Sequence, residues 1–197
     1  MYKKLYEKIV NGIVENGYII VNEAINADLV SLLLDVAKEE EYKEAGISAS
    51  SALHKDRSRR RDKIYWLEGS DSRQKEYLSF TQGLREYLNR TLYLGLSYYE
   101  AHFALYEEGD FYEKHLDAFK GSKNRVVTTV FYLNDKWKEE DGGALLIYDD
   151  EKLITKVLPT SNTLVVFLSD KFPHEVLPAK RKRHSIAGWF RVDKRDD

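Results

Sequence analysis

Apolar residues recur at helical spacing near the start of the chain and then give way to a short, continuously apolar run. Residues 2–16 carry Leu5, Ile9 and Ile13 about one helical turn apart, with charged residues between them. This spacing predicts an amphipathic helix. After a glycine, the uninterrupted apolar residues 18–21 predict a short buried strand.

Two more helices and one strand are expected before residue 95. Asn26 is a suitable N-cap for a helix that continues to about Glu41, because apolar residues after it again fall on one face. Residues 64–67 are typical of a strand, and residues 72–90 of a third helix. We expect these helices to buttress one face of a sheet.

The pattern changes from Tyr98 onward, where short β-branched and aromatic segments alternate with turn residues. Eight strands are predicted, at about 98–106, 111–118, 125–133, 143–148, 152–158, 162–168, 173–178 and 183–192. Short strands at this spacing favour a sandwich or barrel, including the jelly-roll type. The prediction is a mainly β (α+β) fold in one domain, residues 1–197, with helical residues 1–95 and a β core at 96–192.

Composition narrows the chemistry without pointing to a substrate. With 43% hydrophobic and 32% charged residues and a formal net charge of -2, the chain is typical of a globular protein without a general attraction to nucleic acid. It has no cysteine, so thiol catalysis and thiolate metal sites are excluded. No apolar run approaches the ~20 residues of a membrane span, and the N-terminal residues lack a signal-type segment. We expect a cytoplasmic protein without a membrane partner.

The sequence offers one combination of side chains suited to a transition metal. His115 and Asp117 are two residues apart on a predicted strand, so both side chains point to the same face. His174 is a third candidate, 57 positions beyond Asp117. Two imidazoles and one carboxylate on one face of a metal form the facial triad of non-haem Fe(II) oxygenases. The alternative is a surface histidine beside a solvated carboxylate.

Arg183 follows nine positions after His174 and opens the last predicted strand. On that strand Arg183, Ser185, Ala187 and Trp189 share one face, and the small residues leave room for a ligand. A guanidinium buried in a barrel requires an anion, and its planar fork matches a carboxylate. The alternative is that Arg183 belongs to a solvated basic run, residues 180–183.

These residues resemble those of the 2-oxoglutarate- and Fe(II)-dependent dioxygenases, whose catalytic domain is a double-stranded β-helix (jelly roll). The match is closer to the prolyl 4-hydroxylase family, especially the hypoxia-sensing prolyl hydroxylases and their bacterial relatives. It covers about residues 60–192 and is weaker for the first 55. The segments that carry it are Arg61–Gly69, Arg125–Asn134 with Trp137 and Gly142-Gly143, His174–Ala179 and Arg183–Trp189.

The resemblance implies roles for individual residues. His115, Asp117 and His174 would be the iron ligands and, with Arg183, the catalytic set. Arg183 would bind the distal carboxylate of 2-oxoglutarate, with a hydrogen bond from Tyr132. The remaining residues with implied positions are Tyr106 at the cosubstrate pocket, Trp189 beside the metal, Thr128 and Ser185 as supporting hydrogen-bonding residues, and Arg125, Arg60 and Asp62 with Trp189 as substrate contacts.

Residues 46–61 are small, polar and basic and occupy the place of a substrate lid in the resembled family. Their arginines, with Arg125, would favour acidic or carbonyl-rich partners. An RNA footprint and a simple solvated loop are the alternatives. The other histidines are expected to have no role: His184 to face outward, His102 to lie outside the motif and His54 to belong to this loop.

The resemblance implies an oxidoreductase that uses Fe(II) and 2-oxoglutarate, with ascorbate as a possible further cofactor, and hydroxylates a prolyl residue. Its partners would be a proline-bearing protein substrate and dioxygen, and nucleic acid is disfavoured by the acidic balance. Two alternatives stay open: the same chemistry on a small molecule or free amino acid, and a non-enzymatic metal-binding β-barrel.

Overall fold

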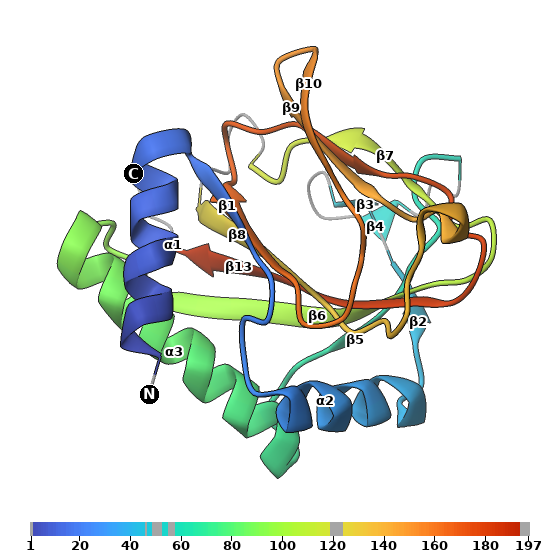
Figure 1. Cartoon of the computed structure of the whole chain (residues 1–197), viewed down its shortest axis with the longest axis horizontal. Helices are drawn as coiled ribbons and strands as arrows, with labels where there is room; N and C mark the ends of the chain where they lie inside the picture. Colours follow the sequence, from blue (N-terminus) through green and yellow to red (C-terminus); the bar gives the residue numbers. More distant parts are fainter. Residues whose placement is uncertain (1, 46, 49–52, 55–57, 119–123, 194–197) are drawn as a thin grey trace.

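The computed structural model describes residues 2–45, 47–48, 53–54, 58–118 and 124–193. Two antiparallel sheets face each other, and three helices pack outside the larger one (Figure 1). Within the described part of the chain, no helix is both long and apolar enough to cross a membrane. The predicted mainly β fold with a jelly-roll core is confirmed.

The larger sheet has seven strands in the order β1-β11-β8-β13-β6-β5-β2. Long central strands pair over their full length, with Arg183 opposite Tyr106 and Trp189 opposite Glu100. The strands are β1 (Tyr18–Val21), β2 (Lys43–Glu44), β5 (Lys63–Trp66), β6 (Tyr98–Tyr106), β8 (Arg125–Tyr132), β11 (Leu164–Leu168) and β13 (Arg183–Arg191).

The smaller sheet has four strands in the order β10-β9-β12-β7, and a separate hairpin pairs β3 with β4. These strands are β3 (Ile47–Ser48), β4 (Leu53–His54), β7 (Tyr112–His115), β9 (Leu145–Asp149), β10 (Lys152–Val157) and β12 (His174–Val176). A short 3-10 helix, Glu139–Asp141, precedes β9. Because β12 pairs with both β7 and β9, it holds the two halves of this sheet together.

The helices are α1 (Lys3–Asn16), α2 (Ala27–Glu39) and α3 (Ser72–Leu92). Their apolar faces and the outer face of the larger sheet form one core, which includes Leu33, Leu84, Phe131 and Phe190. A second core lies between the two sheets and contains the buried apolar residues Ile147, Val165, Phe167 and Phe172. The larger sheet is therefore covered on both faces.

Most elements begin and end close to their predicted positions. Asn26 caps α2 as expected, since its side chain accepts a hydrogen bond from the Asp28 amide at 2.7 Å, although α2 ends at Glu39. One prediction is wrong: His184 does not face outward but is 8% exposed. Alternation does turn its side chain away from Arg183, yet that second face of β13 is covered in turn.

Candidate metal and cosubstrate site

A cavity of about 830 Å³ lies between the two sheets, and side chains from both sheets line it. On β13 the lining residues are Arg183, Ser185, Ala187 and Trp189, the set that alternation predicts to share a face. Tyr106, Arg60, Asp62, Arg125 and the three metal-ligand candidates also line this cavity.

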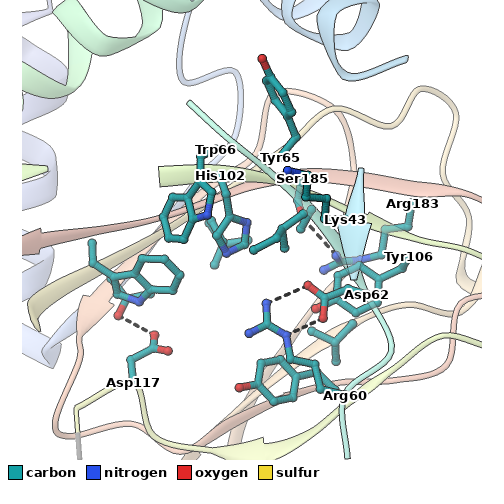
Figure 2. Close-up of a pocket in the computed structure, with 18 of the residues that line it drawn as sticks. Lys43, Arg60, Asp62, Tyr65, Trp66, His102, Tyr106, Asp117, Arg183 and Ser185 are labelled. Atoms are coloured by element: carbon teal, nitrogen blue, oxygen red, sulfur yellow. Dashed lines mark hydrogen bonds and ion pairs between the residues drawn. The ribbon is translucent and has the colours of Figure 1, made fainter. Parts of the chain in front are cut away.

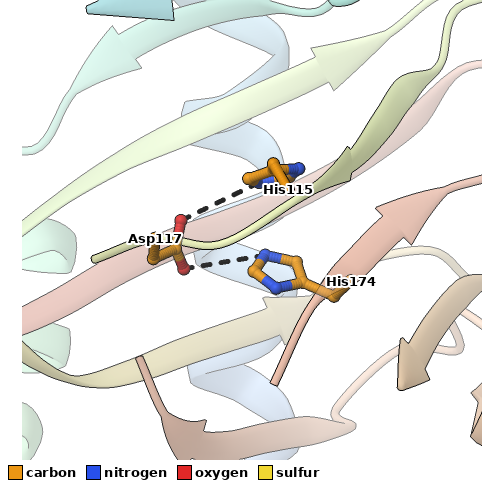
Figure 3. A group of neighbouring side chains, drawn as sticks. All are labelled: His115, Asp117 and His174. Atoms are coloured by element: carbon orange, nitrogen blue, oxygen red, sulfur yellow. Dashed lines mark ion pairs between the residues drawn. The ribbon is translucent and has the colours of Figure 1, made fainter. Parts of the chain in front are cut away.

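The three metal-ligand candidates meet at one point on the cavity wall (Figure 3). His115 ends β7 and His174 begins β12, and these two residues are paired across the strands. Asp117 lies 3.8 Å from the Nε2 atom of His115 through Oδ1 and 3.6 Å from that of His174 through Oδ2. The ligand atoms all lie within 4.8 Å of one another, which is compact enough for a single ion to contact all three.

Neighbouring groups fix the orientation of each of these side chains. The Nδ1 atom of His115 lies 2.7 Å from the Glu113 carbonyl, and that of His174 lies 3.0 Å from the Phe172 carbonyl. Because a carbonyl only accepts, both Nδ1 atoms carry the proton and both Nε2 atoms present lone pairs to the centre. Thr128 donates a 2.8 Å hydrogen bond from its hydroxyl to Asp117 Oδ2.

Electrostatics leave the site in the protonation state that a cation requires. Burial lowers the pKa of His115, and His174 nearby lowers it further. Burial alone would raise the pKa of Asp117, but the two imidazoles outweigh it and leave the pKa below its ordinary value. At neutral pH His115 is therefore neutral and Asp117 ionised, the forms that bind metal.

Arg183 lines the same cavity and is 1% exposed. Its Nε donates to the Gly143 carbonyl at 2.9 Å and its Nη1 to the Ser185 hydroxyl at 3.2 Å. In the described part of the chain, no carboxylate forms an ion pair with it. The cation is thus buried without an anion, which is costly unless a ligand supplies one.

Two tyrosines surround this guanidinium. Its Cζ lies 4.7 Å from the Tyr106 ring centroid and 5.0 Å from that of Tyr132. The Tyr132 hydroxyl is buried and has no hydrogen-bond partner among the described residues. Burial raises the pKa of Tyr132 to about 12, against the opposing effect of Arg183. The hydroxyl is therefore a protonated donor beside an unpaired cation, a combination suited to a carboxylate.

Arg60 and Asp62 form a bidentate ion pair on the cavity wall (Figure 2). The Nε–Oδ1 distance is 2.6 Å and the Nη2–Oδ2 distance 2.9 Å. The Arg60 guanidinium also lies 4.6 Å from the Tyr112 ring centroid, and Tyr112 stacks on His115 with 3.6 Å between centroids. A continuous stack thus joins the residues just before β5 to a metal-ligand candidate.

Arg125 and Trp189 form the wall near Asp117. The Arg125 guanidinium lies 3.8 Å from the centroid of the Trp189 ring, and its Nη2 lies 3.3 Å from Glu100 Oε1. Like Arg60, Arg125 has its own carboxylate partner.

Half of the predicted lid, at residues 46, 49–52 and 55–57, lies outside the described residues. Its last residues run along β7: Arg60 bridges Tyr112, and the Arg61 amide donates to the Phe111 carbonyl at 3.1 Å. Arg59 forms a 3.0 Å ion pair with Glu113. The end of the segment therefore lies beside the strand that carries His115.

Comparison with known proteins agrees with this geometry. Residues 101–191 match the family described as the 2OG-Fe(II) oxygenase superfamily. A Pseudomonas putida prolyl-4-hydroxylase of known crystal structure has 36% sequence identity to this chain. The two structures superpose with a TM-score of 0.87 over 96% of this chain and 100% of that one. The chain belongs to the prolyl 4-hydroxylase family of 2-oxoglutarate- and Fe(II)-dependent oxygenases. Its members are oxidoreductases that require Fe(II) and 2-oxoglutarate.

Two further relatives of this oxygenase carry more specific descriptions. A Trichoplax adhaerens prolyl hydroxylase, solved in complex with a hypoxia-inducible factor oxygen degradation domain peptide fragment, is 27% identical. Its TM-score is 0.84, over 95% of this chain and 89% of that one. A Caenorhabditis elegans hypoxia-inducible factor prolyl hydroxylase is 29% identical over 93% of this chain, which spans only 28% of that relative's length.

The oxygenase cavity also contains two aromatic residues that sequence reasoning left without a role. His102 and Trp66 are paired across β6 and β5, and both line the cavity. Since Tyr106 is implied at the cosubstrate pocket, alternation along the same strand places Ala104 and His102 on that face. That signal was sufficient to find His102. The position of Trp66 depends on the pairing of β5 with β6, which no local pattern reveals.

Proposed function

We propose that this chain is an Fe(II)- and 2-oxoglutarate-dependent dioxygenase that hydroxylates a prolyl residue of a protein substrate. The observation that carries the proposal is the cavity itself. It is lined both by a two-histidine, one-carboxylate cluster and by a buried arginine that forms no ion pair with any described carboxylate.

The donor set of His115, Asp117 and His174 fits Fe(II). Two neutral imidazoles and one carboxylate on one side of an ion leave its remaining positions to a cosubstrate and dioxygen. When bound, the iron supplies dioxygen activation coupled to oxidative decarboxylation of 2-oxoglutarate. The contribution of the chain is to hold the three ligand atoms in place through the Glu113 and Phe172 carbonyls and the Thr128 hydroxyl.

The unsatisfied groups around Arg183 fit the distal carboxylate of 2-oxoglutarate. The guanidinium supplies charge and Tyr132 supplies an O–H donor that has no other described partner. Gly143 allows the Arg183 side chain to pack closely against its backbone, because a Cβ atom there would lie 3.0 Å from the Arg183 Cδ. Arg183 would orient the cosubstrate, and Tyr106 would form the wall beside it.

A proline-bearing polypeptide is the proposed substrate. The cavity volume, about 830 Å³, is at the upper end of the ~300–1,000 Å³ typical of small-molecule sites, which leaves space beyond a cosubstrate. Arg125, Arg60, Asp62 and Trp189 would contact the substrate. Support for a prolyl target comes from the descriptions of the Pseudomonas and Trichoplax relatives.

Succinate release tests this function directly. The full chain with Fe(II) and 2-oxoglutarate is incubated with proline-containing peptides and with matched peptides in which alanine replaces the proline. We expect succinate and a peptide mass gain of one oxygen atom only when proline is present. Succinate stimulated by free amino acids but by no peptide would favour the small-molecule alternative. Metal binding without any succinate would favour a non-enzymatic barrel.

Cytoplasmic location and a one-domain organisation of residues 1–197 belong to the same proposal. Fractionation of the source cells tests the location, and a single cooperative unfolding transition followed by two probes tests the domain organisation.

A further inference from the structure

Trp66 is a large apolar side chain that remains 43% exposed while lining the cavity. It is the last residue of β5, near the cavity mouth, and its ring lies edge-on to His102 with 5.2 Å between centroids (Figure 2). An indole in this position offers an apolar surface and a negative π face to a ligand.

Several carboxylates line the same cavity as this indole. Because β2 runs antiparallel to β5 with Lys43 opposite Ile64, the residues that precede β2 run toward Trp66. Glu68 follows Trp66 by two positions. The cavity-lining carboxylates on this side are Glu39, Glu40, Glu41, Glu44 and Glu68, and Lys43 is the basic residue among them. Glu39 pairs with Arg73 at 3.0 Å, and among these described residues carboxylates still outnumber basic side chains.

His102 adds a polar ring to the lining of the cavity beside Trp66. The side chain is 2% exposed, and its Nδ1 lies 3.2 Å from the Phe103 carbonyl. Burial, assisted by the nearby Arg60 charge, lowers the pKa of His102 to about 4, so the ring is neutral. Nδ1 then carries the proton, and Nε2 is an acceptor for which the described residues provide no donor.

We propose that Trp66, His102 and the carboxylates at the mouth form a subsite for a basic side chain of the polypeptide substrate, near the target proline. The inference rests on the proposed prolyl hydroxylase function. In this subsite the stem of a lysine or arginine packs on the indole and its charge faces Glu41 and Glu68. One of its N–H groups donates a hydrogen bond to Nε2 of His102.

This assignment differs from the sequence-based expectation of acidic partners. Three of the arginines expected to attract them are already paired with carboxylates: Arg60 with Asp62, Arg59 with Glu113 and Arg125 with Glu100. Their charges are therefore largely neutralised within the protein. The negative charge at the mouth is the larger remaining feature that a substrate would meet.

Calorimetric binding of three peptides tests the subsite. They share one proline-containing sequence and carry lysine, norleucine or glutamate at one position beside the proline, with both neighbouring positions tried. The full chain is loaded with Fe(II) and 2-oxoglutarate without dioxygen, so binding is measured without turnover. We expect the lysine peptide to bind about three- to tenfold more tightly than norleucine, and glutamate more weakly than either.

Variants separate the subsite from general charge effects. The double variant Glu41→Gln, Glu68→Gln should remove most of the lysine preference. Glu7→Gln with Glu15→Gln makes the same charge change on exposed positions of α1 away from the cavity and should keep it. His102→Leu should weaken lysine-peptide binding, and His102→Gln, which retains an acceptor, should restore part of it.

The outcomes distinguish the two proposals. Equal binding of the three peptides, with turnover of all three, would overturn the basic-side-chain subsite and leave prolyl hydroxylation standing. A lysine preference that survives the Glu41→Gln, Glu68→Gln change would overturn the subsite as well. A failure of every peptide to bind or react would overturn the polypeptide substrate and the subsite with it.

Discussion

Arg60, which is half-buried, and Arg183, which is buried, line the same cavity, but their charges are balanced in opposite ways. Arg60 has a carboxylate of its own, Asp62, held through two hydrogen bonds of 2.6 and 2.9 Å. Among the described residues, Arg183 donates hydrogen bonds to a carbonyl and a hydroxyl but not to a carboxylate, and beside it the Tyr132 hydroxyl has no described partner.

The difference separates a structural cation from one that waits for a ligand. A buried ion pair is complete within the protein, and removing one partner leaves an uncompensated charge. A buried cation without an anion is instead completed by whatever binds. The same residue type can therefore be assigned to the scaffold or to cosubstrate binding from its neighbours alone.

Loss of a metal-ligand candidate should have the largest effect on activity and should leave both arginines in place. His174→Ala removes one of three proposed ligands, so we expect turnover to be abolished while the unfolding free energy changes by only about 1 kcal/mol. Succinate assays and thermal unfolding measure the two effects. His184→Ala is the matched control, because His184 is also a buried histidine but lies on the face of β13 that points away from the cavity. Full activity in His174→Ala would contradict the triad.

Substitutions at Asp62 and at Arg183 test whether the two arginines differ in this way. Asp62→Asn removes the buried carboxylate that holds Arg60 through two hydrogen bonds and should cost about 3 kcal/mol of stability. Arg183→Met removes a cation that has no internal anion, so its stability should change far less, while 2-oxoglutarate binding is lost. Denaturant unfolding and calorimetry supply the readouts. Equal destabilisation by both changes would show that Arg183 is a scaffold residue too.

Much of the candidate site could be predicted from the sequence. The spacing of His115, Asp117 and His174 predicts the cluster, and alternation along residues 183–189 predicts the cavity face of β13. Arg183 proves to be buried although Lys180, Arg181 and Lys182 just before it are exposed. Strand alternation distinguishes it from that solvated basic run, because the strand begins at Arg183 itself.

Other features depend on contacts that no local pattern records. His184 was expected to face outward because alternation places it opposite Arg183, but the helices cover that face of the sheet. A central strand buried on both faces loses the simple inside–outside alternation. The carboxylates that line the cavity with Trp66 come from residues near 40 and 68, and the pairing of β2 with β5 brings these two segments together.

Arg183→Lys sharpens the comparison with a smaller change. It keeps the charge but loses the planar fork and two of its donors, so 2-oxoglutarate should bind more weakly by about 1.5–3 kcal/mol. Metal affinity measured without 2-oxoglutarate should stay unchanged. Calorimetric titration with each ligand separates the two quantities. An unaltered affinity for 2-oxoglutarate would remove Arg183 from the cosubstrate site.

Thr128→Val should have the smallest effect and tests whether orientation of a ligand matters as much as its presence. The substitution keeps the shape of the side chain but removes the 2.8 Å hydrogen bond to Asp117 Oδ2. Loss of such a supporting bond costs about 10- to 100-fold in metal affinity, and we expect the lower end because two histidines remain fixed by carbonyls. Thr129→Val is the control: this buried neighbour bonds to Tyr99 and the Gly188 carbonyl on the opposite face of the sheet. It should therefore lower stability by about 1 kcal/mol without changing metal affinity. If Thr128→Val and Thr129→Val weaken metal binding equally, the effect comes from a change in the sheet and not from the orientation of the Asp117 carboxylate.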